Sequence, residues 1–171
     1  VIFVSGHFDN FELLAMSIEK SGVDLAALYR PLNNVFLNKI MKKIRLKYIC
    51  KNQIPKGLGG VKEMLNFFNK GTSLALMIDQ RVSQGTKINF FNQLAYTTTI
   101  PAQFVKKFNC PIVPMYIKRI NKYSFKIHVE EPIHFNKSDT IEKITLNLNS
   151  WLEKKIYQNP SQWIWSHSRW K

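Results

Sequence analysis

Short apolar runs alternate with segments of helical periodicity along the first two thirds of the chain. The runs are continuous, as expected for strands buried on both faces of a sheet, and they cover residues 1–5, 25–29, 74–78 and 112–117. Apolar residues three or four positions apart predict the helices between them, at residues 10–19, 36–44, 59–71 and 99–108. This alternation indicates an α/β fold.

The last third of the chain changes this pattern. Polar and apolar residues alternate over 123–129 after a turn at 121–122, which predicts an antiparallel hairpin with the preceding strand. A helix is predicted at about 140–157. The predicted fold class is therefore α/β, with a mixed, mostly parallel central sheet flanked by helices and a late antiparallel hairpin. Because no repeat or Pro/Gly-rich linker divides the sequence, we expect one domain over residues 1–171.

The amino-acid composition says more about the binding partner of the protein than about its fold. Hydrophobic residues form 45% of the 171 residues, which is enough for a packed core and excludes a disordered chain. The formal net charge is +14. Such a charge favours an anionic partner: a nucleic acid, an acidic carrier protein or a phosphate-bearing membrane surface. Cys50 and Cys110 are far apart in the sequence, and we expect both to be free thiols.

Two features bear on the membrane. The chain begins at Val1, inside a predicted strand, so we expect that an N-terminal segment carrying a membrane anchor is missing. No apolar run approaches the roughly 18 residues of a spanning helix. In the helix around 36–44, lysines at 39, 42, 43 and 47 lie largely opposite the apolar positions, which suits an anionic membrane surface. A solvated helix face is the alternative.

Residues 6–12 join the first predicted strand to the first helix. Ligands of open α/β sheets bind beyond the carboxyl ends of the strands, so His7 lies where chemistry is expected. Imidazole is suited to act as a base near neutral pH, and Glu12 is placed to fix its tautomer. The same spacing fits three alternatives: Asp9 and Glu12 as an N-cap with its capping box, His7 as an ordinary loop residue, or a metal site with His7 and Asp9. The sequence shows no further cluster of metal ligands that could complete a site with His7 and Asp9, so we expect no metal.

Other polar residues follow predicted strands. Arg30 precedes Pro31, which keeps it out of helical geometry, and its guanidinium can bind a phosphate through two hydrogen bonds; a surface arginine is the alternative. Asp79 ends a buried strand, where it can order Arg30, Arg81 or a sugar hydroxyl, or simply form a turn. Residues 97–99, three threonines, are expected to cap the next helix.

Four short motifs occur in a fixed order. They are HFDNFE at 7–12, YRP at 29–31, DQ at 79–80 and WIWSHSRWK at 163–171. Together they resemble the motifs of bacterial lipid A biosynthesis acyltransferases, which belong to the lysophospholipid acyltransferase superfamily and share an HX4E element. Asp9 and Phe11 depart from the Gly and Trp that are common in that element. We expect the additional carboxylate of Asp9 to alter the electrostatics around His7 or to repel an anionic substrate.

The resemblance implies a glycerolipid acyltransferase-like fold and a specific reaction. An acyl group would pass from acyl carrier protein, its thioester donor, to a hydroxyl of a lipid A precursor in lipopolysaccharide biosynthesis, at the cytoplasmic face of the bacterial inner membrane. His7 is then the general base and Glu12 its orienting partner, with no cofactor. The expected partners are acyl carrier protein, the anionic lipid precursor and the membrane surface. Residues expected to bind substrate are Arg30, Asp79, Asn10 and Arg81.

Two other functions remain as alternatives. One is an O-acyltransferase of the same superfamily that acts on a glycerolipid or another acceptor. The other is a nucleic-acid-binding module, which charge alone supports. Because aromatic residues are not concentrated in the basic stretches, as a stacking platform requires, we expect no nucleic acid partner.

Overall fold

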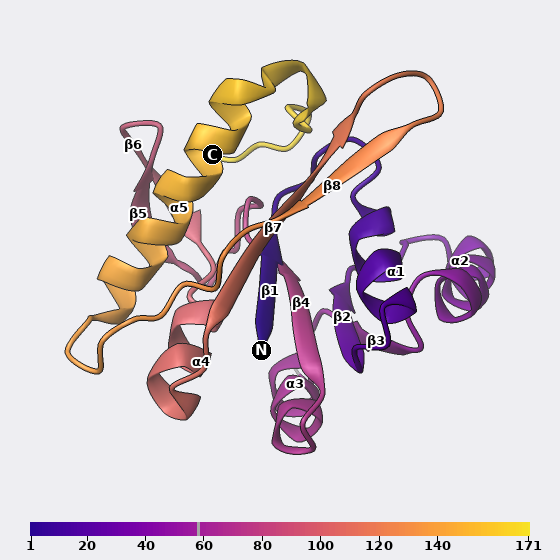
Figure 1. Ribbon diagram of the computed structural model, residues 1–171, viewed down its shortest axis with the longest axis horizontal. Coiled ribbons are helices and arrows are strands. Elements are labelled where there is room, and N and C mark those ends of the chain that lie inside the picture. The colour runs from indigo at the N-terminus through magenta and orange to yellow at the C-terminus, as the bar shows by residue number, and fades with distance from the viewer. Residues whose placement is uncertain (58) are drawn as a thin grey trace. The chain divides into compact units, whose positions relative to one another are not determined.

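The computed structural model describes residues 1–57 and 59–171, and Figure 1 shows the arrangement of their helices and strands. A six-stranded sheet has the strand order β3-β2-β4-β1-β7-β8, and β5 and β6 form a separate two-stranded sheet. The elements, in chain order, are β1 (Ile2–Ser5), α1 (Glu12–Lys20), β2 (Leu25–Tyr29), α2 (Val35–Tyr48), β3 (Asn52–Pro55), α3 (Gly60–Asn69), β4 (Ser73–Met77), β5 (Thr86–Phe90), β6 (Gln93–Thr97), α4 (Ile100–Phe108), β7 (Ile112–Arg119), β8 (Phe125–Val129), α5 (Ile141–Gln158) and a 3-10 turn (Pro160–Gln162).

The predicted fold class is confirmed. β2 pairs in parallel with both β3 and β4, β1 pairs in parallel with β7, and the late pair β7–β8 is antiparallel. The chain divides into two compact units, which we describe separately. None of the described helices is both long and apolar enough to cross a bilayer.

The first unit contains Val1 and residues 12–76, with helices α1, α2 and α3. Its parallel strands are fully buried at Leu25, Ile54 and Leu74. The helices α1 and α3 each bury an apolar face, whereas α2 buries none of its residues. Apolar periodicity therefore predicts the position of α2 correctly, but the apolar face of this helix does not belong to the core.

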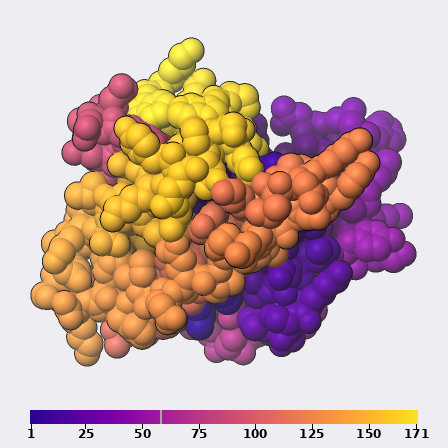
Figure 2. Space-filling view, turned by 45° about the horizontal axis from the view of Figure 1, so that its top comes forward, coloured from indigo at the N-terminus to yellow at the C-terminus, as the bar shows by residue number. Residues whose placement is uncertain are grey.

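The second unit contains residues 2–11 and 77–171. In it, α5 packs against β5 and α4, and three apolar residues of the helix are almost completely buried: Ile144, Leu148 and Leu152. Figure 2 shows α5 beside the hairpin β7–β8 on one face of this unit, where the Trp151 indole donates to Glu130. This packing holds the strand that pairs with β1, and so it supports the loop that follows β1.

Three features were not predicted. The short strand β3 is one, and the hairpin β5–β6 is another. The two turn residues of this hairpin, Phe91 and Asn92, both have positive φ, at 52° and 59°, as a two-residue type I′ turn requires. The third is the place of Thr97, which is the buried end of β6 and not a helix cap. Thr99 is the N-cap of α4, as expected, although its side chain makes no capping bond, and Thr98 Oγ1 accepts from the Ile100 amide at 3.4 Å.

Candidate active site

His7 lies in the loop directly after β1, in the second unit. The strand holds the start of this loop, since the Ser5 carbonyl accepts a hydrogen bond from the Ile78 amide. Gly6 allows close packing: a Cβ atom there would lie 2.8 Å from Leu152 Cδ1 and 3.3 Å from Asp79 Oδ2. The His7 side chain keeps an exposed fraction of 15%. The ring is therefore held at the carboxyl end of a buried strand while part of it stays open to solvent.

Asp79 is the carboxylate that binds the His7 ring. Its Oδ1 is 2.7 Å from His7 Nδ1, and its Oδ2 accepts hydrogen bonds from the His7 backbone amide at 2.7 Å and from Trp163 Nε1 at 2.8 Å. Asp79 is 2% exposed. Both oxygens are thus engaged, which differs from the expectation that Asp79 orders an arginine or a sugar hydroxyl.

The protonation of this pair follows from its surroundings. Burial raises the pKa of Asp79, but the hydrogen bonds and charge of His7, with the bond from Trp163, outweigh it and leave the pKa lowered. A carboxylate accepts hydrogen bonds, so the tautomer of His7 that fits has its proton on Nδ1 and an unprotonated Nε2. The Gln80 side-chain nitrogen is 3.3 Å from Nε2. The chemistry available to His7 is therefore proton acceptance at Nε2.

The C-terminal segment braces the same loop. The Ile164 amide donates to the His7 carbonyl at 3.0 Å, and the Asp9 amide donates to the Gln162 carbonyl at 2.8 Å. Trp163 adds its indole bond to Asp79, described above. Residues far apart in the chain thus fix the backbone on both sides of the imidazole, and Phe11 places its ring edge against it, with ring centroids 4.5 Å apart.

Arg169, in the C-terminal motif, is a buried structural cation. It is 1% exposed, and its guanidinium donates to the Tyr96 carbonyl and to Thr97 Oγ1 at 2.8 and 2.7 Å. Burial lowers the pKa of Arg169 to about 10, although the charge of Asp79 opposes that shift. Because this arginine ties the end of the chain to β6, the motif has a packing role in addition to its contact with Asp79.

Asp9 forms an ion pair, where sequence had indicated a disturbance of His7. Its two oxygens accept hydrogen bonds from Arg119 Nε at 2.8 Å and Arg119 Nη2 at 2.5 Å. The bond from Arg119 lowers the pKa of Asp9. The additional carboxylate is thus neutralised by a cation from β7. Among the described residues, no three His, Cys, Asp or Glu side chains gather as a metal site requires.

Glu12 has a different partner from the one expected. Its Oε1 accepts from Arg45 Nε at 2.9 Å and from Arg45 Nη2 at 2.7 Å, within the first unit. The Arg45 guanidinium also lies over the Tyr29 ring, 5.4 Å from its centroid. Asp79 takes the place at the imidazole Nδ1 that sequence had given to Glu12. The catalytic roles of His7 and Glu12 stay predictions.

Arg45 is a residue that sequence reasoning missed. Its Nη1 is buried and has no hydrogen-bond acceptor among the described residues. The signal available in the sequence was its position four residues after Met41, which places both residues on one side of the helix; the structure shows that this side is half-buried. Gln80 is the second residue whose place at the ring was not predicted.

The remaining predicted substrate residues are Arg30 in the first unit and Asn10 and Arg81 in the second. Arg30, directly after β2, and Asn10, in the loop before α1, are exposed. Arg81 is half-buried, with its guanidinium 5.3 Å from the centroid of the Tyr96 ring, and its backbone amide donates to His167 Nε2. Of the residues expected to bind substrate, the structure brings Asp79 into contact with His7, and the substrate roles of the others stay predictions.

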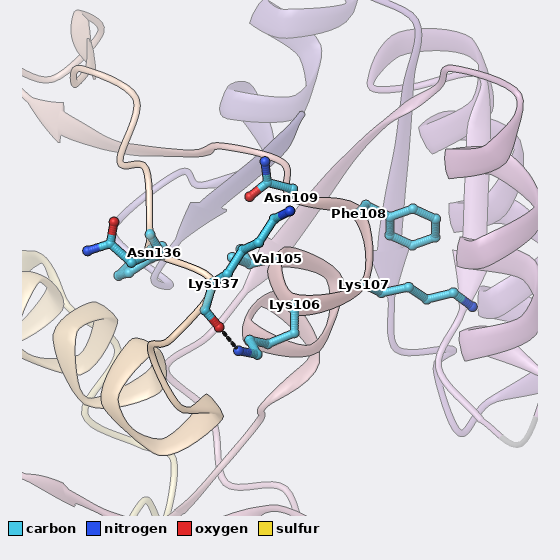
Figure 3. A pocket seen from close by; sticks show the side chains of 8 residues that line it. Val105, Lys106, Lys107, Phe108, Asn109, Asn136 and Lys137 are labelled. Carbon is cyan, nitrogen blue, oxygen red and sulfur yellow. Dashed lines mark hydrogen bonds between the residues drawn. The ribbon is translucent and has the colours of Figure 1, made fainter.

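A cavity of about 390 Å³ lies elsewhere in the second unit, between the end of α4 and residues 135–137 (Figure 3). Lys106 spans it through a hydrogen bond from Nζ to the Lys137 carbonyl. β7 begins shortly after α4, and its first residue pairs with the first residue of β1. The cavity is thus near the amino ends of these strands, whereas His7 follows the carboxyl end of β1.

Comparison with known proteins identifies the family of the chain. Residues 1–171 match the family described as bacterial lipid A biosynthesis acyltransferase. A search of curated proteins finds no match. The family match includes the strand-end histidine, the aspartate that binds it and the C-terminal segment that braces both. The chain therefore belongs to the family of bacterial lipid A biosynthesis acyltransferases.

Proposed function

We propose that this protein transfers a fatty acyl group from the thioester of acyl carrier protein to a hydroxyl group of a lipid A precursor. Family membership gives acyl transfer in lipid A biosynthesis. The donor, the acceptor and a location at the cytoplasmic face of the bacterial inner membrane are our proposals. The observation that supports the reaction is the mostly buried but solvent-accessible imidazole of His7, whose Nδ1 is bonded to the buried Asp79.

The proposed first step is a proton transfer to His7. As the acceptor oxygen bonds to the thioester carbonyl carbon, its proton moves to Nε2 of the ring. The ring becomes an imidazolium, and the anionic Asp79 at Nδ1 stabilises that positive charge. General base catalysis by a positioned side chain contributes about 10²–10⁴-fold to a rate. The Gln80 amide lies 3.3 Å from Nε2, and we propose that the acceptor hydroxyl displaces it to reach the ring.

The second step returns the proton. The tetrahedral intermediate collapses, the carbon–sulfur bond breaks, and the imidazolium gives its proton to the departing sulfur. The products are the acylated lipid and the free thiol of the carrier protein, so His7 ends as it began. The intermediate carries an oxyanion that needs hydrogen-bond donors, and we propose the Asn10 side chain for this task.

Charge supports the proposed partners. The net charge of +14 attracts both an acidic carrier protein and the phosphates of a lipid A precursor. Arg30 and Arg81 are our candidates for phosphate binding, since a guanidinium can hold a phosphate through two parallel bonds.

Transfer of a labelled acyl chain from acyl carrier protein to the lipid A precursor tests this proposal. We expect His7→Ala to abolish transfer while the folded state persists by circular dichroism. His134→Ala is the matched control, because His134 is an exposed histidine of the same unit. Transfer by His7→Ala at the rate of the control would contradict the role of His7 as base. Competition with a glycerolipid acceptor in the same assay distinguishes the lipid A precursor from the acceptor of related O-acyltransferases.

A further inference from the structure

We propose that α2 is a membrane-docking helix that inserts one row of apolar side chains into an anionic lipid surface. This inference rests on the membrane location proposed above and names the element that makes the contact. It draws on three observations from the first unit: an exposed apolar row, a neighbouring row of lysines and a polar inner face.

The apolar row runs the length of the helix. Phe36, Ile40, Ile44 and Tyr48 are four residues apart and therefore lie along one line of the surface. Their exposed fractions are 79%, 55%, 41% and 56%, and no residue of α2 is buried. Exposed apolar surface that is contiguous marks an interaction site, whereas single exposed residues do not. This row needs a partner that accepts hydrocarbon.

The lysines lie beside this row, and not opposite it as expected from the sequence. Lys39, Lys43 and Lys47 form the adjacent line of the helix surface, and Lys42 is exposed as well. No acidic residue occurs within Val35–Tyr48. A lysine can place its methylenes along an apolar surface and keep its charge at the level of the headgroups. The two rows together match the depth profile of an interfacial helix, with apolar residues below and cations at the lipid phosphates.

The inner face explains why the apolar row points outward. Asn38, Met41 and Arg45 are the half-buried positions of the helix. Asn38 Oδ1 accepts from the Leu32 amide, in the loop before the helix, at 2.9 Å, and Arg45 binds Glu12 of α1. The ion pair therefore holds the Arg45 side of α2 toward α1, in contrast to a helix of a soluble domain, which turns its apolar face inward. The exposed row is thus part of the folded arrangement of this unit.

Charge selects the bilayer over other occupants. A second copy of the chain would bring two lysine rows together, which like-charge repulsion opposes. An acidic protein would satisfy the lysines, but it needs a complementary apolar groove for a row that extends over the whole helix. An anionic bilayer satisfies both rows without a shaped partner, because lipid headgroups and acyl chains adapt to the helix.

Vesicle flotation tests this proposal with the 171-residue chain. We expect binding to phosphatidylcholine vesicles that contain phosphatidylglycerol, and binding at least about tenfold weaker for the double variant Phe36→Ser/Ile40→Ser, because two apolar side chains no longer leave water. For Lys39→Gln/Lys43→Gln we expect a loss of the preference for phosphatidylglycerol and a weaker salt dependence. The matched control is Leu146→Ser/Lys154→Gln, two exposed residues of α5, which we expect to bind like the unaltered chain.

Measuring acyl transfer to an acceptor dispersed in detergent distinguishes the docking role of α2 from the proposed acyltransferase activity. We expect the α2 variants to keep transfer in detergent while they lose flotation. Flotation of Phe36→Ser/Ile40→Ser that equals the control would overturn the docking role of α2, even if acyl transfer is demonstrated. Unchanged flotation together with loss of a complex with acyl carrier protein would also overturn it and would assign the helix to the carrier protein.

Discussion

Two carboxylates, Asp79 in the second unit and Glu12 in the first, each bind one basic side chain, but their settings differ. Asp79 is 2% exposed and accepts bonds through both oxygens from a ring, a backbone amide and an indole. The Glu12 side chain is 30% exposed and uses one oxygen toward Arg45. The first is part of a dry, satisfied network, whereas the second is a half-exposed ion pair.

The difference shows that closeness in sequence is a poor guide to which carboxylate binds an imidazole. Glu12 is five residues from His7, and Asp79 is 72 residues away, yet Asp79 holds the imidazole. Burial also changes how much each carboxylate contributes to the free energy of unfolding, because leaving a buried polar group without its partner costs more than breaking an exposed pair. The predictions below test this contrast.

Asp79→Asn should have the largest effect. The amide nitrogen of asparagine meets groups that are themselves donors, so the ring loses its orientation and the tautomer with a free Nε2 is no longer favoured. We expect acyl transfer to fall at least about a thousandfold and the free energy of unfolding to fall by about 2–3 kcal/mol. Steady-state rates and urea denaturation measure the two effects. A rate within a few-fold of the unaltered protein would show that the contact is incidental.

Glu12→Gln and Arg45→Gln should each reduce transfer by less than Asp79→Asn does, and their effects should not add. Each variant breaks the same ion pair, so the double variant has little more to lose. We expect losses of about ten- to a hundredfold for either single change and a similar loss for the double variant. Additive losses on a logarithmic scale would mean that Glu12 and Arg45 act separately, against the pairing described here.

Trp163→Phe sharpens the first prediction, since it removes one donor from Asp79 and keeps an aromatic ring. The two bonds to His7 remain, so we expect a loss of about 1 kcal/mol in the free energy of unfolding and a roughly tenfold slower transfer. Trp165→Phe is the control, because the Trp165 indole donates to the Pro160 carbonyl and is 55% exposed. If the two variants have equal transfer rates and equal free energies of unfolding, the Trp163 bond does not support Asp79.

The smallest effect concerns Asp9. Its pKa in the folded state is lowered from 3.8 by the bond from Arg119, so its contribution to stability is present above that value and is lost as the pH falls through the lower folded pKa. Asp9→Asn lacks this contribution. We therefore expect the variant to melt a few degrees below the unaltered protein at neutral pH, with a gap that closes below pH 3.8. A gap that widens in acid would contradict the stabilising pair.

Sequence predicted the parts of the fold that local periodicity controls. The range 25–29 coincides with β2, and the late hairpin occurs where alternation placed it. The hairpin β5–β6 was missed because its turn uses Phe91 and Asn92 at positive φ, instead of the Asn-Gly or Asp-Gly pair that signals a type I′ turn. The short strand β3, four residues ending in Pro55, carries too little pattern to be recognised.

The site was predicted in location but not in its contacts. His7 and Asp79 were both placed at the ligand edge of the sheet, because both follow buried strands. Their bond depends on how strands from distant parts of the chain are ordered in the sheet, which periodicity does not encode. For α2, the sequence pattern placed lysines and apolar residues on one helix. It could not show that the apolar row is exposed, which follows from the exposed fractions and from the bond of Arg45 to Glu12 on the other side of the helix.

The central claim is that Asp79 acts in catalysis through His7. The most direct test is the transfer rate of the double variant His7→Ala/Asp79→Asn compared with that of His7→Ala alone, each verified as folded. If the carboxylate works only by orienting the ring and stabilising its charge, removing it after the ring is gone changes the rate by no more than about twofold. A double variant slower than His7→Ala by the full factor seen for Asp79→Asn would contradict the claim.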